Sequence, residues 1–261
     1  MSAAVIASQI SLPNPTPLRP PPLTLLNGAS LFLDFDGTLV EIVGRPDDVA
    51  VDDRLSRLME RLAQRTEGRL AIVSGRSVSQ IQQLFAKRPF AVSGSHGLEM
   101  SWPDGRTEAP ARPPGLEAMI AEMQQLKALH PGIVVEEKPF GVGLHFRQAP
   151  QAAGACEALA IRLARESGLS LQPGKMVFEI RLAGANKGSA IEAFLNTSEM
   201  AGTIPIFLGD DETDEAGFVV AAERGGAGIL VGPERPTAAR YRLNDVTATR
   251  DWLEAAAEEH K

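Results

Sequence analysis

Continuous apolar runs alternate along the chain with stretches in which apolar residues recur every three or four positions. Leu31 to Phe35 and Leu70 to Val73 are runs of the first kind, which is typical of strands buried in a parallel sheet. The residues between these runs carry one apolar helical face. Its members are Val51, Leu55, Leu58, Met59 and Leu62. Strand, helix and strand in this order indicate a parallel α/β unit.

The same alternation continues further along the chain. A short apolar run at Phe90 to Val92, which ends at Ser93 and Gly94, predicts a third strand. The other predicted elements are a helix stripe at Val78, Ile81, Leu84 and Phe85, a turn at Trp102–Gly105, a helix at Ala190–Leu195, strands at Ile204–Leu208 and Ala227–Val231, a helix from Asp214 and a last helix near Thr249–Glu258.

Between these two parts the pattern changes, beginning at the proline-rich residues 110–114. We expect a helix, two strand-like runs, a second helix and another strand, which together make an α+β module. They lie at Leu116–Leu126, Ile133–Glu136, Val142–Phe146, Cys156–Leu163 and Lys175–Ile180. The sequence therefore predicts a discontinuous Rossmann-like core of residues 23–108 and 185–261, with an inserted cap of residues 109–184.

Composition narrows the class of protein. The formal net charge of −7 argues against a nucleic-acid backbone or an anionic membrane as partner, because both require clustered cations. Cys156 is the single cysteine, so no internal disulfide is possible, and its position among alanines predicts a small buried apolar residue. Residues 1–22 are proline-rich and lack the pattern of a secretory signal, which predicts a disordered leader. With no apolar stretch near the roughly 20 residues of a membrane span, we expect a soluble cytoplasmic protein, of open oligomeric state.

Five residues after the first strand, Asp34 to Thr38, combine two carboxylates, a glycine and a hydroxyl. Because side chains alternate along a strand, Asp34 and Asp36 point to the same side, with Phe35 buried opposite. Gly37 allows the backbone to approach a phosphate with its amides. A carboxylate is a known nucleophile in phosphoryl transfer, and a second carboxylate can then act as proton donor. Taken alone, the acidic pair could equally belong to a solvated loop or a helix cap.

Three further polar clusters also lie at the ends of predicted core strands or at the start of a helix. They are Ser74-Gly75-Arg76-Ser77, Asn186-Lys187-Gly188 and Gly209 to Glu215. Taken singly, each has a structural explanation as a helix start or a solvated first turn. Taken together, they belong to the edge of an open α/β sheet where ligands bind.

As a set, these clusters predict phosphate chemistry. The carboxylates of Asp34, Asp36, Asp210, Asp211 and Asp214 would repel a phosphate dianion unless a hard cation lay among them, and Mg²⁺ suits oxygen ligands. We expect Asp34 to attack phosphorus, and Asp36 to protonate the leaving oxygen and later activate water. Thr38, Ser74 and Lys187 would hold the phosphoryl oxygens, Asp210 would bind the metal, and Asp214 would support the site.

The four clusters resemble the motifs of haloacid-dehalogenase-like phosphatases, whose cap lies at the same point of the chain. Four further runs resemble trehalose-6-phosphate phosphatases: 94–99, 136–138 followed by 145–147, 174–181, and 209–215. The resemblance implies a Mg²⁺ site formed by Asp34, Asp36, Asp210 and Asp214, with Asp36 contributing its backbone carbonyl. Leu182 departs from the proline that relatives often carry there.

The same resemblance implies that Glu136, Lys138 and Glu179 of the cap bind the sugar. From the residues alone, Glu136 and Lys138 would rather form a solvated strand face. Arg76, His96 and Gly97 are further candidates for substrate contact, although a histidine beside glycines is about as often a turn-stabilising residue.

The leading hypothesis is Mg²⁺-dependent hydrolysis of trehalose 6-phosphate, in trehalose biosynthesis, through an aspartyl-phosphate. The first alternative is a phosphatase for another sugar phosphate, of the sucrose or mannosylglycerate type, because the core motifs do not encode the sugar. From other classes, a receiver-like signalling domain and an inactive sugar-phosphate sensor are also considered. A receiver has no use for Asp36 as an acid or for an inserted cap.

Overall fold

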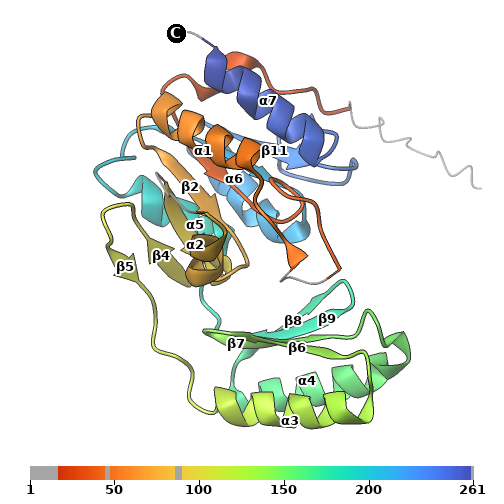
Figure 1. Cartoon of the computed structure of the whole chain (residues 1–261). Coiled ribbons are helices and arrows are strands. Elements are labelled where there is room, and N and C mark those ends of the chain that lie inside the picture. Colours follow the sequence, from red (N-terminus) through yellow and green to blue (C-terminus); the bar gives the residue numbers. More distant parts are fainter. Residues whose placement is uncertain (1–16, 45–47, 86–89, 260–261) are drawn as a thin grey trace, which may run out of the picture.

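The computed structural model describes residues 17–44, 48–85 and 90–259. It contains an eight-stranded sheet and a separate four-stranded antiparallel sheet. In Figure 1 the larger sheet lies in the upper part of the molecule and the smaller sheet in the lower part. The larger sheet is mostly parallel, as the alternation of apolar runs and helical stripes predicts. The predicted class, an α/β core with an inserted α+β unit, is confirmed.

The larger sheet has the strand order β12-β11-β10-β1-β2-β3-β4-β5. The first six strands of this order are parallel, and β4 and β5 are added antiparallel. The strands are β1 (Ala29–Leu33), β2 (Leu70–Val73), β3 (Ala91–Gly94), β4 (Glu99–Ser101), β5 (Thr107–Glu108), β10 (Ile204–Gly209), β11 (Ala227–Val231) and β12 (Tyr241–Leu243). Because β10, β1 and β2 are neighbours, their carboxyl ends meet at one edge.

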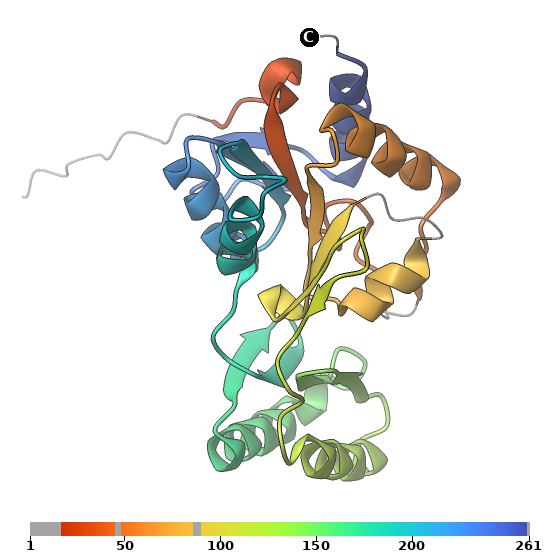
Figure 2. The same cartoon turned by 90° about the vertical axis from the view of Figure 1, so that its left-hand side faces the viewer.

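Helices cover both faces of this sheet (Figure 2). The alternation of β1 explains the two layers, because Leu31 and Leu33 belong to one apolar cluster and Phe32 belongs to the other. The first cluster is covered by the short 3-10 helix η1 (Leu23–Leu26), α1 (Asp53–Arg65), α2 (Val78–Leu84) and α7 (Val246–Glu258), and the second by α5 (Lys187–Leu195) and α6 (Glu215–Glu223). Phe35 is fully buried, as predicted.

The smaller sheet has the order β6-β7-β9-β8. Its strands are β6 (Val134–Lys138), β7 (Gly141–His145), β8 (Ser170–Gly174) and β9 (Val177–Arg181), and its helices are α3 (Leu116–Leu129) and α4 (Ala153–Ser167). Val142, Leu144 and Ile180 pack against these helices in a third apolar cluster. The other face of the sheet is turned toward the larger sheet (Figure 1). Cys156 is buried in this cluster, as predicted.

Four strands were not predicted, namely the short strands β4, β5 and β12 and the five-residue strand β8. The edge strand β8 is mostly exposed and contains Pro173 and Gly174, so it shows no apolar period. The predicted helix, hairpin, helix and strand therefore gain a second hairpin. The described helices include none that is both long and apolar enough to cross a bilayer.

The predicted disordered leader lies mainly outside the described residues, which begin at residue 17. Its last part is packed onto the sheet instead. The amide of Arg242 donates to the carbonyl of Arg19 at 3.0 Å, and Trp252 Nε1 donates to the carbonyl of Pro21 at 3.0 Å. Residues 17–22 therefore lie along the edge strand β12 and against α7.

Candidate active site

The polar clusters lie where the neighbouring central strands end. Asp34 follows β1, Ser74 follows β2 and Asp210 follows β10. The ladders continue one residue past the strands, because the amide of Asp34 donates to the carbonyl of Leu208 at 2.9 Å and that of Ser74 to the carbonyl of Ser93 at 2.9 Å. These bonds place the side chains of Asp34 and Ser74 at one edge of the sheet.

Lys187 reaches this edge from the first turn of α5. Asn186 caps the helix, since its side chain accepts from the amide of Ser189 at 2.9 Å while the Ser189 hydroxyl accepts from the amide of Asn186 at 3.0 Å. This cap starts the helix beside the turn at Ser95–Gly97, and Lys187 is only 3% exposed. The solvated first-turn lysine considered from the sequence is therefore excluded.

Lys187 joins the acidic residues into one cluster. Its Nζ donates to Asp34 Oδ1 at 2.7 Å and to Asp214 Oδ1 at 2.6 Å. Thr38 Oγ1 donates to Asp34 Oδ2 at 3.2 Å. The second oxygen of Asp214 accepts from the amides of Asp210 and Asp211, both at 2.9 Å. Asp34, Asp210 and Asp214 each offer one carboxylate oxygen to a group whose atoms lie within 4.8 Å of one another.

Burial makes this acidic cluster resist ionisation. It raises the pKa of Asp34, Asp210 and Asp214 to about 7 each, and nearby carboxylates add to the rise. Although burial opposes the charge of Lys187, the carboxylates of Asp214 and Asp34 raise its pKa above the usual value. A hard divalent cation prefers carboxylate oxygens and offsets their repulsion, so the donor set fits such an ion.

Two glycines make this close approach possible. Gly37 has φ +82°, and a Cβ atom at this position would overlap the carboxylate of Asp210. A Cβ atom at Gly209 would likewise overlap the side chain of Asp214. Glycine is therefore required at both positions, because any larger residue would collide with the carboxylate of Asp210 or of Asp214.

Asp36 has a different partner. Its carboxylate accepts from Arg76 Nε at 2.7 Å and from Arg76 Nη2 at 2.8 Å, and it is about one third exposed. The backbone amide of Arg76 donates to Ser74 Oγ at 3.1 Å. Arg76 thus holds the second carboxylate of the Asp34–Thr38 cluster beside the loop that follows β2.

His96 and Gly97 form a strained turn next to this loop. Ser95 and His96 have φ +49° and +55°, which is uncommon for residues with a side chain. The His96 ring lies against Gly75, where a Cβ atom would come within 2.6 Å of it, and a Cβ at Gly97 would come within 2.6 Å of the Asn186 carbonyl oxygen. Burial, with the nearby charges of Lys138, Lys187 and Arg181, lowers the pKa of His96 to about 4. His96 is therefore neutral at neutral pH.

In the smaller sheet, Glu136, Lys138 and Glu179 form a compact ion-paired group. Glu136 and Glu179 flank Gly143 in register on β7. Lys138 Nζ lies 2.6 Å from Glu179 Oε2 and 3.8 Å from Glu136 Oε2. The three side chains are only 13–18% exposed. The solvated strand face that the residues alone favoured is wrong, because the three side chains are mostly buried and are paired with one another.

His145 completes this group and was not among the predicted site residues. Its Nε2 atom lies 2.8 Å from Glu136 Oε2. Its position two residues after Gly143 on β7 places it on the same face. This periodicity is the signal that could have found it.

The polar group at the strand ends of the larger sheet and the polar group of the smaller sheet face each other. The charges of Glu179 and Lys138 act on His96 of the core, and that of Arg76 acts on Glu136. The structure thus gathers the predicted residues into a core group, which contains Asp34, Asp36, Thr38, Ser74, Arg76, Lys187, Asp210 and Asp214, and a facing group with Glu136, Lys138 and Glu179. His96 and Gly97 lie on the core side between them.

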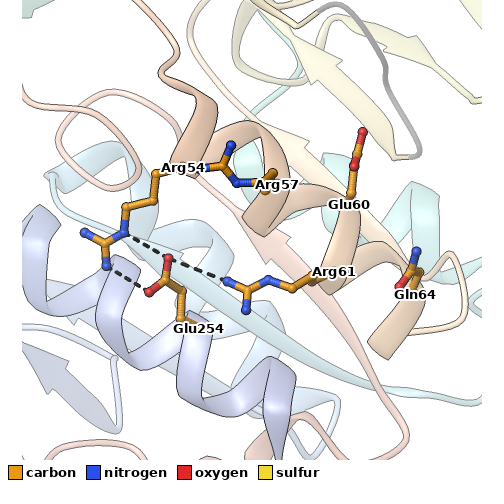
Figure 3. A pocket seen from close by; sticks show the side chains of 6 residues that line it. All are labelled: Arg54, Arg57, Glu60, Arg61, Gln64 and Glu254. Carbon is orange, nitrogen blue, oxygen red and sulfur yellow. Dashed lines mark hydrogen bonds and ion pairs between the residues drawn. The ribbon is translucent and has the colours of Figure 1, made fainter.

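A separate surface hollow lies between α1 and α7 (Figure 3). Arg54 Nε donates to Glu254 Oε1 at 2.9 Å, and Arg61 lies 3.6 Å from the same carboxylate. Exposed pairs of this kind contribute little to stability, because water screens them. The ion pairs in this hollow join α1 to α7, and its lining includes none of the residues of the acidic group or of the facing group.

The comparisons with known proteins agree with this geometry. The family model described as trehalose-phosphatase matches residues 32–247. Over 225 residues the chain is 38% identical to the trehalose-6-phosphate phosphatase of Escherichia coli (strain K12), with 85% of this chain and 84% of the relative covered. Over 215 residues it is 40% identical to a probable trehalose-phosphate phosphatase of Sinorhizobium fredii (strain NBRC 101917 / NGR234), with 82% and 81% covered.

Solved structures resemble the whole fold. A trehalose-6-phosphate phosphatase related protein superimposes with a TM-score of 0.72 at 28% identity, covering 86% of this chain and 95% of the other. The C-terminal domain of C. albicans trehalose-6-phosphate phosphatase has a TM-score of 0.78 at 23% identity, covering 94% and 99%. The second likeness concerns the fold alone, and it shows that both sheets recur together.

Proposed function

The chain belongs to the trehalose-phosphatase family and is thus a phosphoric monoester hydrolase, and from this premise we propose that it converts trehalose 6-phosphate to trehalose and phosphate in trehalose biosynthesis. The observation that carries the proposal is the buried group of Asp34, Lys187 and Asp214 at the strand ends, opposite a second polar group on the smaller sheet. The buried group at the strand ends suits a phosphate, and the polar group of the smaller sheet suits a polyhydroxylated leaving group.

In the proposed mechanism, Asp34 is the nucleophile. One of its oxygens attacks phosphorus, the bond from phosphorus to the sugar oxygen breaks, and an aspartyl-phosphate forms. Lys187, at 2.7 Å from Asp34 Oδ1, stabilises the ionised carboxylate. With Thr38 and Ser74, Lys187 is also placed to donate to the phosphoryl oxygens, where negative charge must be balanced.

Asp36 handles the protons in this proposal. In its protonated form the Asp36 carboxyl gives its proton to the leaving sugar oxygen. The carboxylate that remains then accepts a proton from the water that attacks the aspartyl-phosphate and releases phosphate. The two hydrogen bonds from Arg76 hold this carboxylate in one orientation. A carboxylate oriented in advance loses less entropy when the proton is transferred.

We assign the metal site to Asp34, the backbone carbonyl of Asp36 and Asp210, with Mg²⁺ as the ion. Asp214 lies within the same acidic group. We assign it a supporting role, because it accepts from Lys187 and from the backbone amides of Asp210 and Asp211 and so fixes the loop that carries Asp210. When bound, Mg²⁺ supplies the positive charge that allows a phosphate to approach several carboxylates.

The sugar is assigned to the smaller sheet. The carboxylates of Glu136 and Glu179 accept from hydroxyl groups and Lys138 donates to them, with His96, Gly97 and Arg76 contributing from the core side. A site with buried polar groups rejects analogues that leave those groups unpaired. We accordingly propose residues 109–184 as the sugar-reading cap and residues 23–108 with 185–261 as the catalytic core.

Phosphate release from a substrate panel tests this proposal. Trehalose 6-phosphate, sucrose 6-phosphate and glucose 6-phosphate are compared at equal concentration with the same enzyme preparation. We expect kcat/KM for trehalose 6-phosphate to exceed that for the others at least about tenfold. A preference for sucrose 6-phosphate would instead favour the other sugar-phosphate class.

A further inference from the structure

Arg181 lies on the face of the smaller sheet that is turned toward the core. It is two residues after Glu179 on β9, so both side chains project from the same face. Across the sheet, Arg181 pairs in register with Gly141, which in turn pairs with Lys138. Arg181 therefore forms a second polar row beside the row of Glu136, Gly143 and Glu179.

The guanidinium of Arg181 is only partly satisfied. Its Nη2 donates to Gln172 Oε1 at 3.1 Å. Its Nε and Nη1 atoms are buried and have no hydrogen-bond partner among the described residues. Buried donors without partners are rare in folded proteins and costly, because they lose water without gaining a replacement. A ligand that accepts hydrogen bonds would remove this cost.

The position of the Arg181 side chain depends on a glycine in the neighbouring strand. A Cβ atom at Gly141 would come within 2.8 Å of Arg181 Cβ, so a side chain on the middle strand would displace it. With Gly141 and Gly143, the middle strand carries no side chain between the charged residues of β6 and β9. Lys138 and Arg181 therefore stand on either side of a strand position that carries no side chain. The charge of Arg181 also acts on His96 of the core.

We propose that Arg181 is a specificity-determining residue that donates hydrogen bonds from Nε and Nη1 to hydroxyl oxygens of the sugar. This inference rests on the proposed function, and it adds two donor atoms to the group formed by Glu136, Glu179, Lys138 and His145. A sugar hydroxyl both donates and accepts, so it needs donors as well as carboxylates around it. Arg181 acts on the leaving group and leaves the phosphoryl chemistry of the core untouched.

The test compares Arg181→Met with Arg181→Lys, and with Arg162→Met as a control on the outer helix α4. Arg162 is exposed and paired with Glu122 and Glu166, away from the facing surfaces. Steady-state kcat and KM are measured for trehalose 6-phosphate and for p-nitrophenyl phosphate, and Tm is measured for each variant. The aryl phosphate has no sugar hydroxyls.

We expect Arg181→Met to lower kcat/KM for trehalose 6-phosphate about tenfold to a hundredfold, mainly through KM. Hydrolysis of the aryl phosphate should stay within about twofold, and Tm should be unchanged or higher, because an unsatisfied buried charge is removed. Arg181→Lys should recover part of the loss, and Arg162→Met should match the wild type.

Three results would overturn the inference: equal losses on both substrates, no loss on either, or a loss that follows a lowered Tm. Failure of the proposed function gives a different result, because the wild type itself would then prefer another substrate in the panel. The Arg181→Met effect would in that case be measured on the preferred sugar phosphate.

Discussion

The polar groups of the two sheets are built in different ways. In the core, Asp34 follows a strand, Lys187 opens helix α5 and Asp214 belongs to the turn after β10. Their side chains are at most 5% exposed and are held by one another. In the smaller sheet, Glu136, Lys138 and Glu179 stand on the face of paired strands and retain 13–18% exposure. A phosphate is the same in every ester, whereas the leaving group varies. The difference teaches that the buried group suits the constant part of a substrate and the sheet face suits the variable part.

The largest expected effect comes from Asp34→Asn. An amide is neither charged nor nucleophilic, so we expect at least about a thousandfold loss of kcat on trehalose 6-phosphate and on p-nitrophenyl phosphate alike. Phosphate release measures both, with the exposed Asp53→Asn as control. If Asp34→Asn kept a tenth of the wild-type rate, Asp34 would not be the nucleophile.

Removal of divalent metal should act on the core in the same unselective way. Excess chelator is expected to lower activity on both substrates at least about a hundredfold, and Mg²⁺ should restore it. Mg²⁺ should also raise Tm, because it offsets the repulsion of the clustered carboxylates. Undiminished turnover in chelator, or a Tm that ignores Mg²⁺, would contradict the metal assignment.

Lys187→Met tests the mutual support of the core group. It leaves the buried carboxylates of Asp34 and Asp214 without their cation, so we expect the free energy of unfolding to fall by about 3–5 kcal/mol. Urea denaturation measures this, with the exposed Lys127→Met as control. A loss below about 1 kcal/mol would show that the buried pairs are not coupled as described.

The smallest effect concerns His96, at the boundary of the two groups. Burial lowers its pKa in the folded protein to about 4, below the usual histidine value of about 6.5, so the unfolded chain binds more protons between these pH values and stability rises with pH across them. His96→Asn tolerates the same backbone and removes the titration. Between pH 7.5 and pH 5 the wild type should lose about 1–2 kcal/mol more than the variant. Parallel pH profiles from urea denaturation would contradict this.

The core was largely predictable because its signals are local. The predicted strands at 204–208 and 227–231 match β10 and β11 to within one residue, since each is a buried apolar run. The edge strand β12 was missed because three residues carry too little pattern. The strand-end motifs could also be placed together, because parallel strands direct their carboxyl ends to one edge.

The facing surface was less predictable because it depends on pairing between distant strands. From the residues alone, Glu136 and Lys138 were expected to be solvated. Only the register of β6, β7 and β9 brings them beside Glu179 and His145. The unpaired donors of Arg181 likewise depend on where β8 lies. The period of two along β7 could have placed His145 on this face, but no local period gives the pairing of β6 and β9 with β7 or the contact of Arg181 with β8.

The division of labour is tested most directly by the ratio of kcat/KM for trehalose 6-phosphate to kcat/KM for p-nitrophenyl phosphate in Glu179→Gln. The change is nearly isosteric, and it weakens the pair with Lys138 while leaving the core group intact. We expect this ratio to fall at least about tenfold while aryl phosphate hydrolysis stays within about twofold. An unchanged ratio, with both activities reduced equally, would contradict it.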